Sequence, residues 1–409
     1  MEAAGLDVVW VAEAYSYDAV SLMGFLAART ERVQIGSGIL PIYSRTPALT
    51  AMTAAGLDAL SGGRAILGIG ASGPQVIEGF HGVPYDRPVG RTREIIRICR
   101  RVWRREVLTN DGIYPIPLPE GRGTGLGKPL KLINHPKRTD IPIWVAALGD
   151  KNVAMTAELA DGWLPMVLIP EKTRDVFGDA LDAGLAKRSP ELGPLQVTGG
   201  GILALDEEMF EPARAFARAM YALYVGGMGA RGRNFYNTVL ARQGYADAAT
   251  AVQDLYLDGR KEEAAAALPD DFIDRVTLIG PPGRVRERIA ALREAGVTHL
   301  HVTPVATTCR SCSGRSRSGP SAGEGPRRAP RNVTGPHSVM TTSPTAEECA
   351  CSTPPSPCPI DRWRRTSTAT SRRTPGGWAR SDHTSTSPST ACGSGSRSGR
   401  SAPGCWNAS

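Results

Sequence analysis

The glycine-rich run Gly68-Ile-Gly70-Ala-Ser-Gly73 is the first feature of the sequence whose residues could do chemistry. It follows an apolar stretch with strand character, and backbone N–H groups exposed at the carboxyl end of a strand can bind a phosphate. The spacing also fits the G-x-G-x-x-G dinucleotide fingerprint, which follows the first strand of a Rossmann unit with an acid about 20 residues further on. Here the run follows the third expected strand and Glu94 lies inside an expected helix, which disfavours a Rossmann fold. A tight turn without a ligand is the alternative.

Acid–base chemistry is the second possibility, because Glu13 and Tyr15 end the first apolar stretch. A carboxylate can relay a proton and a phenol can donate one to a substrate oxygen, so both residues are candidate catalytic groups. A helix cap or a salt bridge is the alternative role of Glu13. Further polar side chains expected near the same end of the strands are Tyr17, Tyr43, Arg45 and His81, the last of which we interpret as a surface loop residue.

Metal chemistry is not expected. His299 and His301 alternate along the last apolar stretch and therefore point the same way, but no further ligand types cluster with them. The pairs Cys309-x-x-Cys312 and Cys349-x-Cys351 have no His or Cys partners at the spacing of a zinc site.

Alternating strands and helices form the scaffold that must position these residues. Near-continuous Val, Ile and Leu content is typical of strands buried on both faces, and their alternation with helices indicates a parallel α/β fold. The expected strands are Val8–Ala12, Val33–Leu40, Ala65–Ile69, Ile141–Ala147, Gly162–Ile169, Val197–Leu205 and Val297–Val305. The expected helices include Ala48–Leu60, Arg91–Trp103 and Arg284–Ala295.

The strand count points to a TIM-type (β/α)8 barrel. Seven strands are one short of the barrel, and Met1–Gly5 has the pattern of a last helical turn with its capping glycine. We therefore expect a missing βα unit of about 25 residues upstream, so that the barrel lacks its first strand and its final helix. Two long connections, Arg104–Asp140 and Asp206–Asp271, interrupt the repeat. We expect the first near the barrel mouth and the second to act as a lid through Gly226–Gly229.

The composition changes after residue 306 and divides the chain into a barrel, residues 1–306, and a tail, residues 307–409. The tail contains no Leu, Phe, Tyr, Lys or Gln, and seven of the eight cysteines lie in it. Too few apolar residues remain to offset the entropy of folding, so we expect a low-complexity tail, disordered or frame-shifted. It also carries 14 of the 48 basic and only five of the 40 acidic residues, so the barrel is close to neutral and no nucleic-acid interface is expected there.

The cellular location expected from the sequence is the cytoplasm. No apolar run reaches the roughly 18 residues of a membrane helix. The start of the chain, Met-Glu-Ala-Ala-Gly, has neither the basic residues nor the apolar core of a secretion signal. Cys99 is the one cysteine before the tail, which suits a reducing compartment. No membrane partner is expected.

Several motifs in one order resemble luciferase-like monooxygenases, and within that superfamily the actinobacterial oxidoreductases that use the deazaflavin coenzyme F420. The resemblance extends from Met1 to about Val305 and includes no part of the tail. The motifs are Glu2-Ala-Ala-Gly5-Leu-Asp-Val-Val-Trp-Val-Ala-Glu13, Arg29-Thr-Glu-Arg-Val-Gln-Ile-Gly-Ser-Gly38-Ile39, Leu60-Ser-Gly-Gly-Arg64, Gly68-Ile-Gly70 and Ala160-Asp-Gly-Trp163.

The resemblance implies a barrel whose carboxyl-terminal mouth holds a flavin or deazaflavin ring. The cofactor-binding residues that it implies are Gly38, Ile39, Gly70, Ala71, Ser72, Ala146 and Ala147. The first two would form a bulge with a non-prolyl cis peptide that presses the isoleucine against one face of the ring. The next three would offer amides to the cofactor's phosphate and side arm. The two alanines would line the same slot, although plain core alanines are the alternative.

Two positions depart from the family pattern. Ala14 stands where the family often has a histidine after the acid, so a His-based protonation is not supported at this site. Gly73 stands where the sugar-phosphate dehydrogenase branch has a glutamate acid, so a sugar-phosphate substrate is not expected.

The activity that follows from this resemblance is hydride transfer between coenzyme F420 and a small organic substrate. An FMN-dependent monooxygenase is the alternative, because both cofactors would use the same ring slot. A truncated, inactive product is a further alternative, given the start of the chain and its tail. Family members are commonly dimers, so the resemblance also implies a homodimer.

Overall fold

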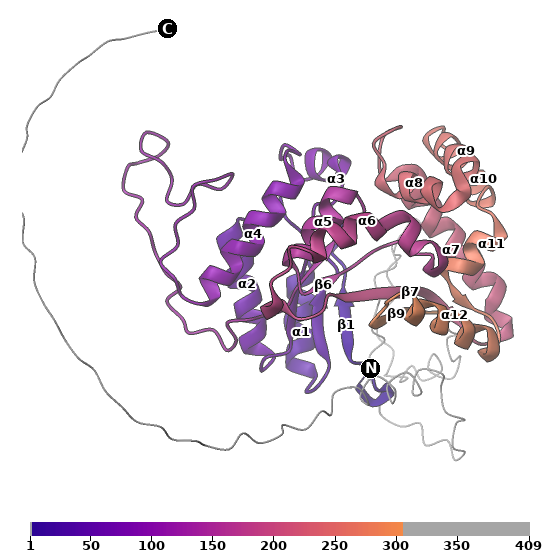
Figure 1. Ribbon diagram of the computed structural model, residues 1–409, viewed down its shortest axis with the longest axis horizontal. Coiled ribbons are helices and arrows are strands. Elements are labelled where there is room, and N and C mark those ends of the chain that lie inside the picture. The colour runs from indigo at the N-terminus through magenta and orange to yellow at the C-terminus, as the bar shows by residue number, and fades with distance from the viewer. Residues whose placement is uncertain (1, 306–409) are drawn as a thin grey trace, which may run out of the picture. The chain divides into compact units, whose positions relative to one another are not determined.

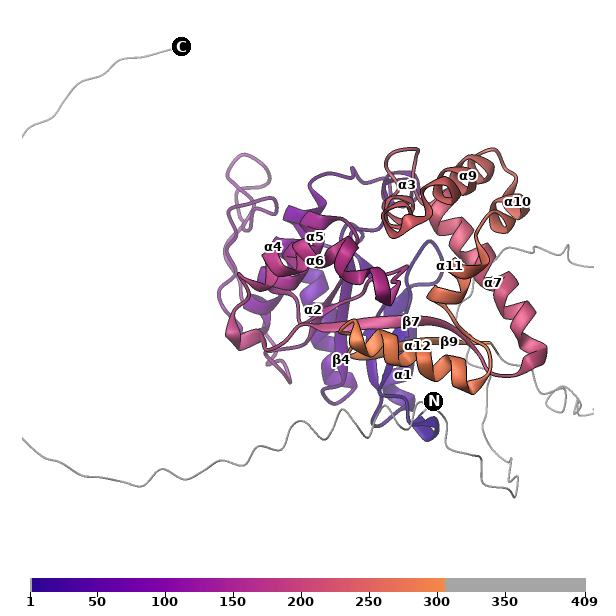
Figure 2. The ribbon, with the colours of Figure 1, turned by 45° about the vertical axis from the view of Figure 1, so that its right-hand side comes forward.

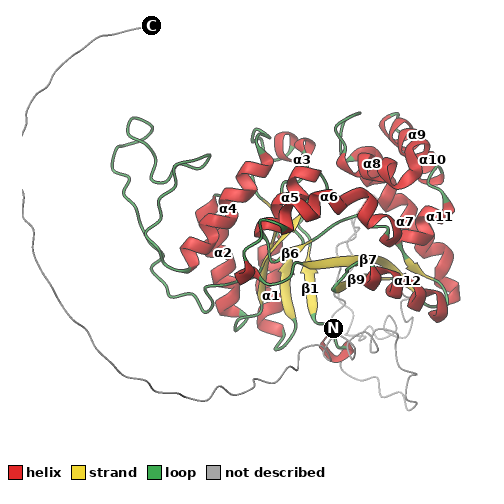
Figure 3. Ribbon diagram, viewed as in Figure 1, coloured by secondary structure: helices red, strands yellow, loops and turns green. Residues whose placement is uncertain are grey.

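The computed structural model describes residues 2–305, which belong to one compact unit of strands and surrounding helices (Figure 1, Figure 3). The expectations for the tail, including its disorder and its cysteine pairs, concern residues outside that range.

The strands form one parallel sheet. Along its main path the order is β1-β2-β4-β5-β6-β7-β8, with β3 on β4 and β9 on β7. Strands β1 and β9 do not pair with each other, so the sheet described by residues 2–305 is a half-barrel. The expected parallel α/β fold is confirmed. The strands are β1 Val8–Val11, β2 Gln34–Ser37, β3 Leu40–Pro41, β4 Ala65–Gly70, β5 Ile143–Ala146, β6 Gly162–Trp163, β7 Gln196–Ala204, β8 Leu278–Ile279 and β9 His299–Pro304.

Helices follow most of these strands, and the three expected from the sequence begin and end within three residues of their predicted bounds. Those between and after the strands are α1 Ala19–Arg29, α2 Pro47–Leu60, α3 Pro74–Gly79, α4 Pro88–Trp103, α5 Asp150–Leu159, α6 Thr173–Leu185 and α12 Pro282–Glu294. Asp18 caps α1 by accepting hydrogen bonds from the N–H groups of Val20 and Ser21, and Thr46 caps α2 in the same way.

The connection between β7 and β8 is helical, as expected for Asp206–Asp271. Its helices α8, α9 and α10 lie together, apart from α1 and α2, in both views (Figure 1, Figure 2). Its elements are α7 Phe210–Ala222, the π-helix η5 Leu223–Gly227, α8 Phe235–Leu240, the π-helix η6 Ala241–Tyr245, α9 Ala246–Leu257, α10 Lys261–Ala266 and α11 Asp270–Val276.

Two expected strands differ from the structure. The stretch Val33–Leu40 is divided into β2 and β3 at the Gly38–Ile39 peptide, which is cis, as the resemblance implies. The stretch Gly162–Ile169 forms only the two-residue strand β6. Val167 has a φ of 61°, a left-handed conformation that no strand contains, and Gln243 of η6 donates a hydrogen bond to its carbonyl oxygen at 2.6 Å. The strand ends at Trp163 because Pro165 has no N–H to donate to β7, and the tertiary contact holds the chain beyond it.

Aromatic side chains pack against one another between the strands. The rings of Trp10 and Trp144 lie 5.3 Å apart, and the ring of His299 lies 5.0 Å from Trp144. A Cβ on Gly162 would lie 2.0 Å from the Trp144 indole, so only glycine leaves room for that ring. His299 is thus a packing residue, as the sequence interpretation allowed.

The connection Arg104–Asp140 follows α4 along its length. Glu94 on α4 accepts hydrogen bonds from the N–H groups of Ile113 and Tyr114, so this segment runs along the outside of α4 and reaches beyond it (Figure 1). Arg138 then contacts Asp58 and the carbonyl of Ala65, the first residue of β4, which is the end opposite to the mouth. Ile113 and Tyr114 lie beside the first turn of α4, because a Cβ on Gly90 would lie 2.8 Å from Cδ1 of Ile113 and Arg91 lies 5.1 Å from the Tyr114 ring. The position of this connection near the mouth stays a prediction.

A cavity of about 280 Å³ lies within the same connection. None of the candidate site residues lines it. The lining residues are Thr109, Asn110, Asp111, Pro115, Ile116, Pro117 and Pro119.

Candidate active site

Three of the expected cofactor-binding residues meet at the carboxyl ends of β4 and β5. Gly70 and Ala146 are register partners in the last pair of these strands. An ideal Cβ on Gly70 would lie 2.9 Å from Cδ1 of Ile39 and 3.3 Å from Cβ of Ala146. The side chain of Ile39 therefore lies over a position where any residue larger than glycine would collide with it. Minimal side chains beside an apolar surface suit the flat ring that the resemblance implies.

The turn after β4 offers two backbone donors. Within residues 2–305, no carbonyl or side chain accepts a hydrogen bond from the N–H groups of Ser72 or Gly73. The N–H of Ala71, in contrast, faces the carbonyl of Ala146 in the last pair of the β4–β5 ladder. Ser72 adopts a φ of 58°, which is uncommon for a residue other than glycine. Consecutive free N–H groups at the end of a parallel strand can hold an anion, so the turn fits a phosphate group.

Ala147 differs from the other expected slot residues. It is buried, and its carbonyl oxygen accepts a hydrogen bond from the indole N–H of Trp163 at 2.9 Å. This contact joins the end of β5 to β6. The structure therefore gives Ala147 a packing contact, and its contact with a cofactor stays a prediction.

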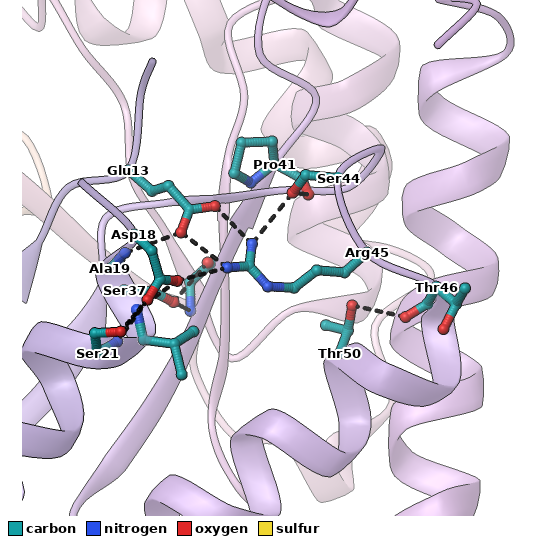
Figure 4. A network of polar contacts seen from close by, with 12 residues as sticks. Glu13, Asp18, Ala19, Ser21, Ser37, Pro41, Ser44, Arg45, Thr46 and Thr50 are labelled. Atoms are coloured by element: carbon teal, nitrogen blue, oxygen red, sulfur yellow. Dashed lines mark hydrogen bonds and ion pairs between the residues drawn. The ribbon is translucent and has the colours of Figure 1, made fainter. Parts of the chain in front are cut away.

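Glu13 lies in a network of ion pairs (Figure 4). Its Oε1 and Oε2 accept hydrogen bonds from the two terminal nitrogens of Arg45 at 2.5 and 2.9 Å, and Oε2 also accepts from the N–H of Ala19 at 3.0 Å. Arg45 further donates to Asp18 and Ser44, both at 3.1 Å. The side chains of Arg45 and Glu13 are only 14% and 9% exposed, and the hydrogen bonds to Glu13 raise the pKa of Arg45.

This network contains both alternative roles of Glu13, the helix cap and the salt bridge. Both carboxylate oxygens of Glu13 are engaged by protein donors, and Arg45 joins the segment after β1 to the segment after β3. Tyr15 lies two residues after Glu13, is 40% exposed, and has its ring 6.3 Å from Phe80. The catalytic roles of Glu13 and Tyr15 stay predictions.

His81 is not the plain surface residue that the sequence suggested. It is half-buried, its ring lies 5.3 Å from Phe80, and its Nε2 atom is buried without a hydrogen-bond partner in the described part of the chain. Tyr17, in contrast, is 84% exposed.

The helical connection contributes residues to the mouth that sequence reasoning missed. The carbonyl oxygen of Met228 would lie 3.7 Å from a Cβ on Gly73, and the ring of Phe235 would lie 3.1 Å from a Cβ on Gly149. Tyr224 and Tyr236 pack at 4.9 Å, and burial, followed by the neighbouring Tyr224 and Tyr85, raises the pKa of Tyr236.

These contacts place the connection beside the turns that follow β4 and β5. The signal in the sequence was Gly226–Gly229, which we expected to act as a lid. A Cβ on Gly226 would lie 2.4 Å from Cβ of Tyr256, and a Cβ on Gly227 would lie 2.5 Å from its ring, so packing explains these two glycines. The motion of a lid stays a prediction.

A parallel α/β half-barrel with small residues and free amides at the carboxyl ends of its strands defines a class of barrel proteins that bind cofactors at the mouth. Comparison with known families identifies the group. The sequence model of the luciferase-like monooxygenase family matches residues 1–299, and the chain belongs to this family.

Two relatives are similar over most of the chain. A protein of Mycobacterium tuberculosis, Rv3520c, named provisionally as a coenzyme F420-dependent oxidoreductase, is 43% identical over 74% of this chain and 88% of its own length. The 5,10-methylenetetrahydromethanopterin reductase of Archaeoglobus fulgidus is 32% identical over 73% of this chain and 85% of its own length.

Solved structures support the fold. The coenzyme F420-dependent tetrahydromethanopterin reductase of Methanopyrus kandleri superposes with a TM-score of 0.61 at 23% identity, covering 74% of this chain and 86% of its own. An F420-dependent secondary alcohol dehydrogenase superposes with a TM-score of 0.57 at 18% identity, covering 74% and 86%. At this identity the likeness concerns the fold alone.

Residues 2–305 contain no helix with the length and apolar character required to span a bilayer. The same residues contain no group of three or more His, Cys, Asp or Glu arranged to hold a metal ion.

Proposed function

We propose that this chain transfers a hydride between coenzyme F420 and a small organic substrate. The observation that carries the proposal is the meeting of Ile39, Gly70 and Ala146 beside the free amides of the following turn. The similarity to Rv3520c and to the methylenetetrahydromethanopterin reductase supports F420 as the cofactor. When bound, the deazaflavin ring supplies the carbon that accepts or donates the hydride.

The residues of the chain are proposed to bind the cofactor and to orient its ring. Ile39 is proposed to support one face of the ring, while Gly70 and Ala146 leave room at its edge. The N–H groups of Ser72 and Gly73 are proposed to hold the anionic side arm.

Tyr15 is the proposed proton donor to the substrate oxygen. The ion pair between Glu13 and Arg45 fixes the segment that carries Tyr15. A proton relay through Glu13 would require this ion pair to open, because both of its oxygens are engaged.

Fluorescence titration with F420 and, separately, with FMN tests the cofactor. We expect saturable binding of F420 and no comparable binding of FMN. Preference for FMN, together with a turnover that requires dioxygen, would favour the FMN-dependent monooxygenase instead. Binding of neither cofactor would overturn the proposal.

The proposed oligomeric state is a homodimer formed through α1 and α2. Phe25, Leu49, Met52 and Leu60 are exposed large apolar residues on these two helices. The only charged residue of α2, Asp58, is buried, so the outer face of this helix carries no charge. The apolar face of α2 can pack against its own copy across a two-fold axis without like-charge repulsion, with Arg29, 5.6 Å from the Phe25 ring, at the border on α1.

The variant Met52→Glu is expected to be monomeric under conditions in which the wild type is dimeric. The new carboxylate would be buried without a partner in the interface, which costs several kcal/mol. Light scattering after size exclusion gives the mass. Leu185→Glu, on α6, is the control and should remain dimeric. A monomeric wild type, or a dimeric Met52→Glu variant, would contradict this interface.

The proposed location is the cytoplasm. Cys99 is a free, fully buried thiol on α4, and burial raises its pKa to about 12. A lone buried thiol with no disulfide partner among residues 2–305 is typical of a protein that works in a reducing compartment.

A further inference from the structure

Tyr85 contacts two other residues of the segment that follows β4. The chain leaves β4 at Gly70, turns at Ser72, forms α3 and returns at Tyr85. Glu78 of α3 accepts a hydrogen bond from the N–H of Tyr85 at 3.0 Å. The hydroxyl of Tyr85 in turn donates to the carbonyl oxygen of Ser72 at 3.3 Å. The hydroxyl of Tyr85, at the end of the segment, therefore holds the turn at Ser72, near its beginning.

The contact with the Ser72 carbonyl sets the direction of the next N–H group. The carbonyl of Ser72 and the N–H of Gly73 belong to one planar trans peptide, in which they point in opposite directions. Because Tyr85 holds the carbonyl on one side, the N–H of Gly73 is directed to the other side. That N–H has no acceptor in the described part of the chain.

Tyr85 is itself well held. Its ring lies 5.1 Å from that of Tyr43, whose hydroxyl donates to the carbonyl oxygen of Asp86 at 2.8 Å. Burial raises the pKa of Tyr85, so the phenol keeps its proton and remains a hydrogen-bond donor at neutral pH. The contacts of Tyr85 with Ser72 and with Tyr43 are both made within the chain, so they can position the turn without help from a ligand.

We propose that Tyr85 is a positioning residue for the phosphate of the cofactor's side arm: its hydroxyl, through the Ser72 carbonyl, aims the N–H of Gly73 at that anion. The inference rests on the proposed function, because it assumes a deazaflavin with a phosphate arm in the slot beside Gly70. It assigns Tyr85 to recognition of the arm and not of the ring.

The Tyr85→Phe variant separates the arm from the ring. It removes only the hydroxyl, so the ring contact with Tyr43 is retained. The dissociation constants of F420 and of the same deazaflavin with its ribityl chain but without the phosphate arm are measured by fluorescence. We expect the affinity for F420 to fall about tenfold, the scale of one weakened charge-assisted hydrogen bond. The affinity for the phosphate-free deazaflavin should remain unchanged.

Tyr221→Phe is the matched control. Tyr221 is also a buried phenol that donates to a backbone carbonyl, that of Val276 at 3.1 Å, and lies outside the turn. Its loss should leave both affinities unchanged. An equal loss of affinity for both ligands in Tyr85→Phe, or no loss for F420, would overturn this inference while the proposed function stands. A wild type that binds neither ligand would overturn both.

Discussion

The Gly70→Val variant is expected to lose cofactor affinity by a factor on the order of 100 while remaining folded. The first added carbon would lie 2.9 Å from Cδ1 of Ile39 and 3.3 Å from Cβ of Ala146, closer than van der Waals contact allows. Valine adds two methyl groups beyond that atom, at the point proposed for the edge of the ring. Fluorescence titration measures the loss, and circular dichroism reports whether the fold is retained.

A second and a third variant make this result specific. Gly70→Ala adds only the first carbon and should lose affinity by a smaller factor, because Ile39 can shift by a few tenths of an ångström. Gly283→Val is the control, since Gly283 lies on α12 with open space where its Cβ would be. A folded Gly70→Val protein with wild-type affinity would show that the ring binds elsewhere.

The parallel strands could be predicted because strands buried on both faces consist of short, nearly continuous runs of apolar residues. Runs such as Ala65–Ile69 are continuous in apolar residues, and the structure places strand β4 there. The bulge at Gly38–Ile39 depended on the resemblance, because the run Val33–Leu40 contains both Gly36 and Gly38 and does not show where the strand divides. The long parallel strands were therefore accessible from local patterns, and their irregular points and the short strand β8 were not.

Most of what the local patterns missed comes from contacts between residues far apart in the sequence. The shortness of β6 has a local cause, because Pro165 has no N–H to donate to the ladder, while the carbonyl of Val167 accepts a hydrogen bond from Gln243, 76 positions later. Residues such as Tyr236 reach the mouth through the fold of the helical connection, which has no local signature. The sequence allowed a salt bridge as an alternative role of Glu13, but it did not identify the partner, Arg45, which comes 32 positions later.

The connection Arg104–Asp140 is attached to the barrel through such a contact, and the contact predicts a large loss of stability. Asp58 is fully buried, and Arg138 donates to its Oδ1 from Nε at 3.0 Å and to the Ala65 carbonyl at 2.6 Å. We expect Asp58→Ala to cost about 3 kcal/mol of folding free energy, the low end for a broken buried pair, because Arg138 is partly exposed. Calorimetry should then show a melting temperature lower by on the order of 10 °C.

A double-mutant cycle and a surface control decide whether the buried pair is the cause. In Asp58→Ala/Arg138→Met no unpaired guanidinium remains, so the double variant should lose less stability than the sum of the single variants, by about 1 kcal/mol. Glu106→Ala removes the exposed partner of Arg101 and Arg104 in the same connection, and should change stability by at most about 1 kcal/mol. Equal effects of Asp58→Ala and Glu106→Ala would mean that the connection is held to the barrel by its other contacts, such as those of Glu94. A large effect confined to Asp58 and Arg138 would show that this ion pair anchors the connection at the base of β4, away from the mouth.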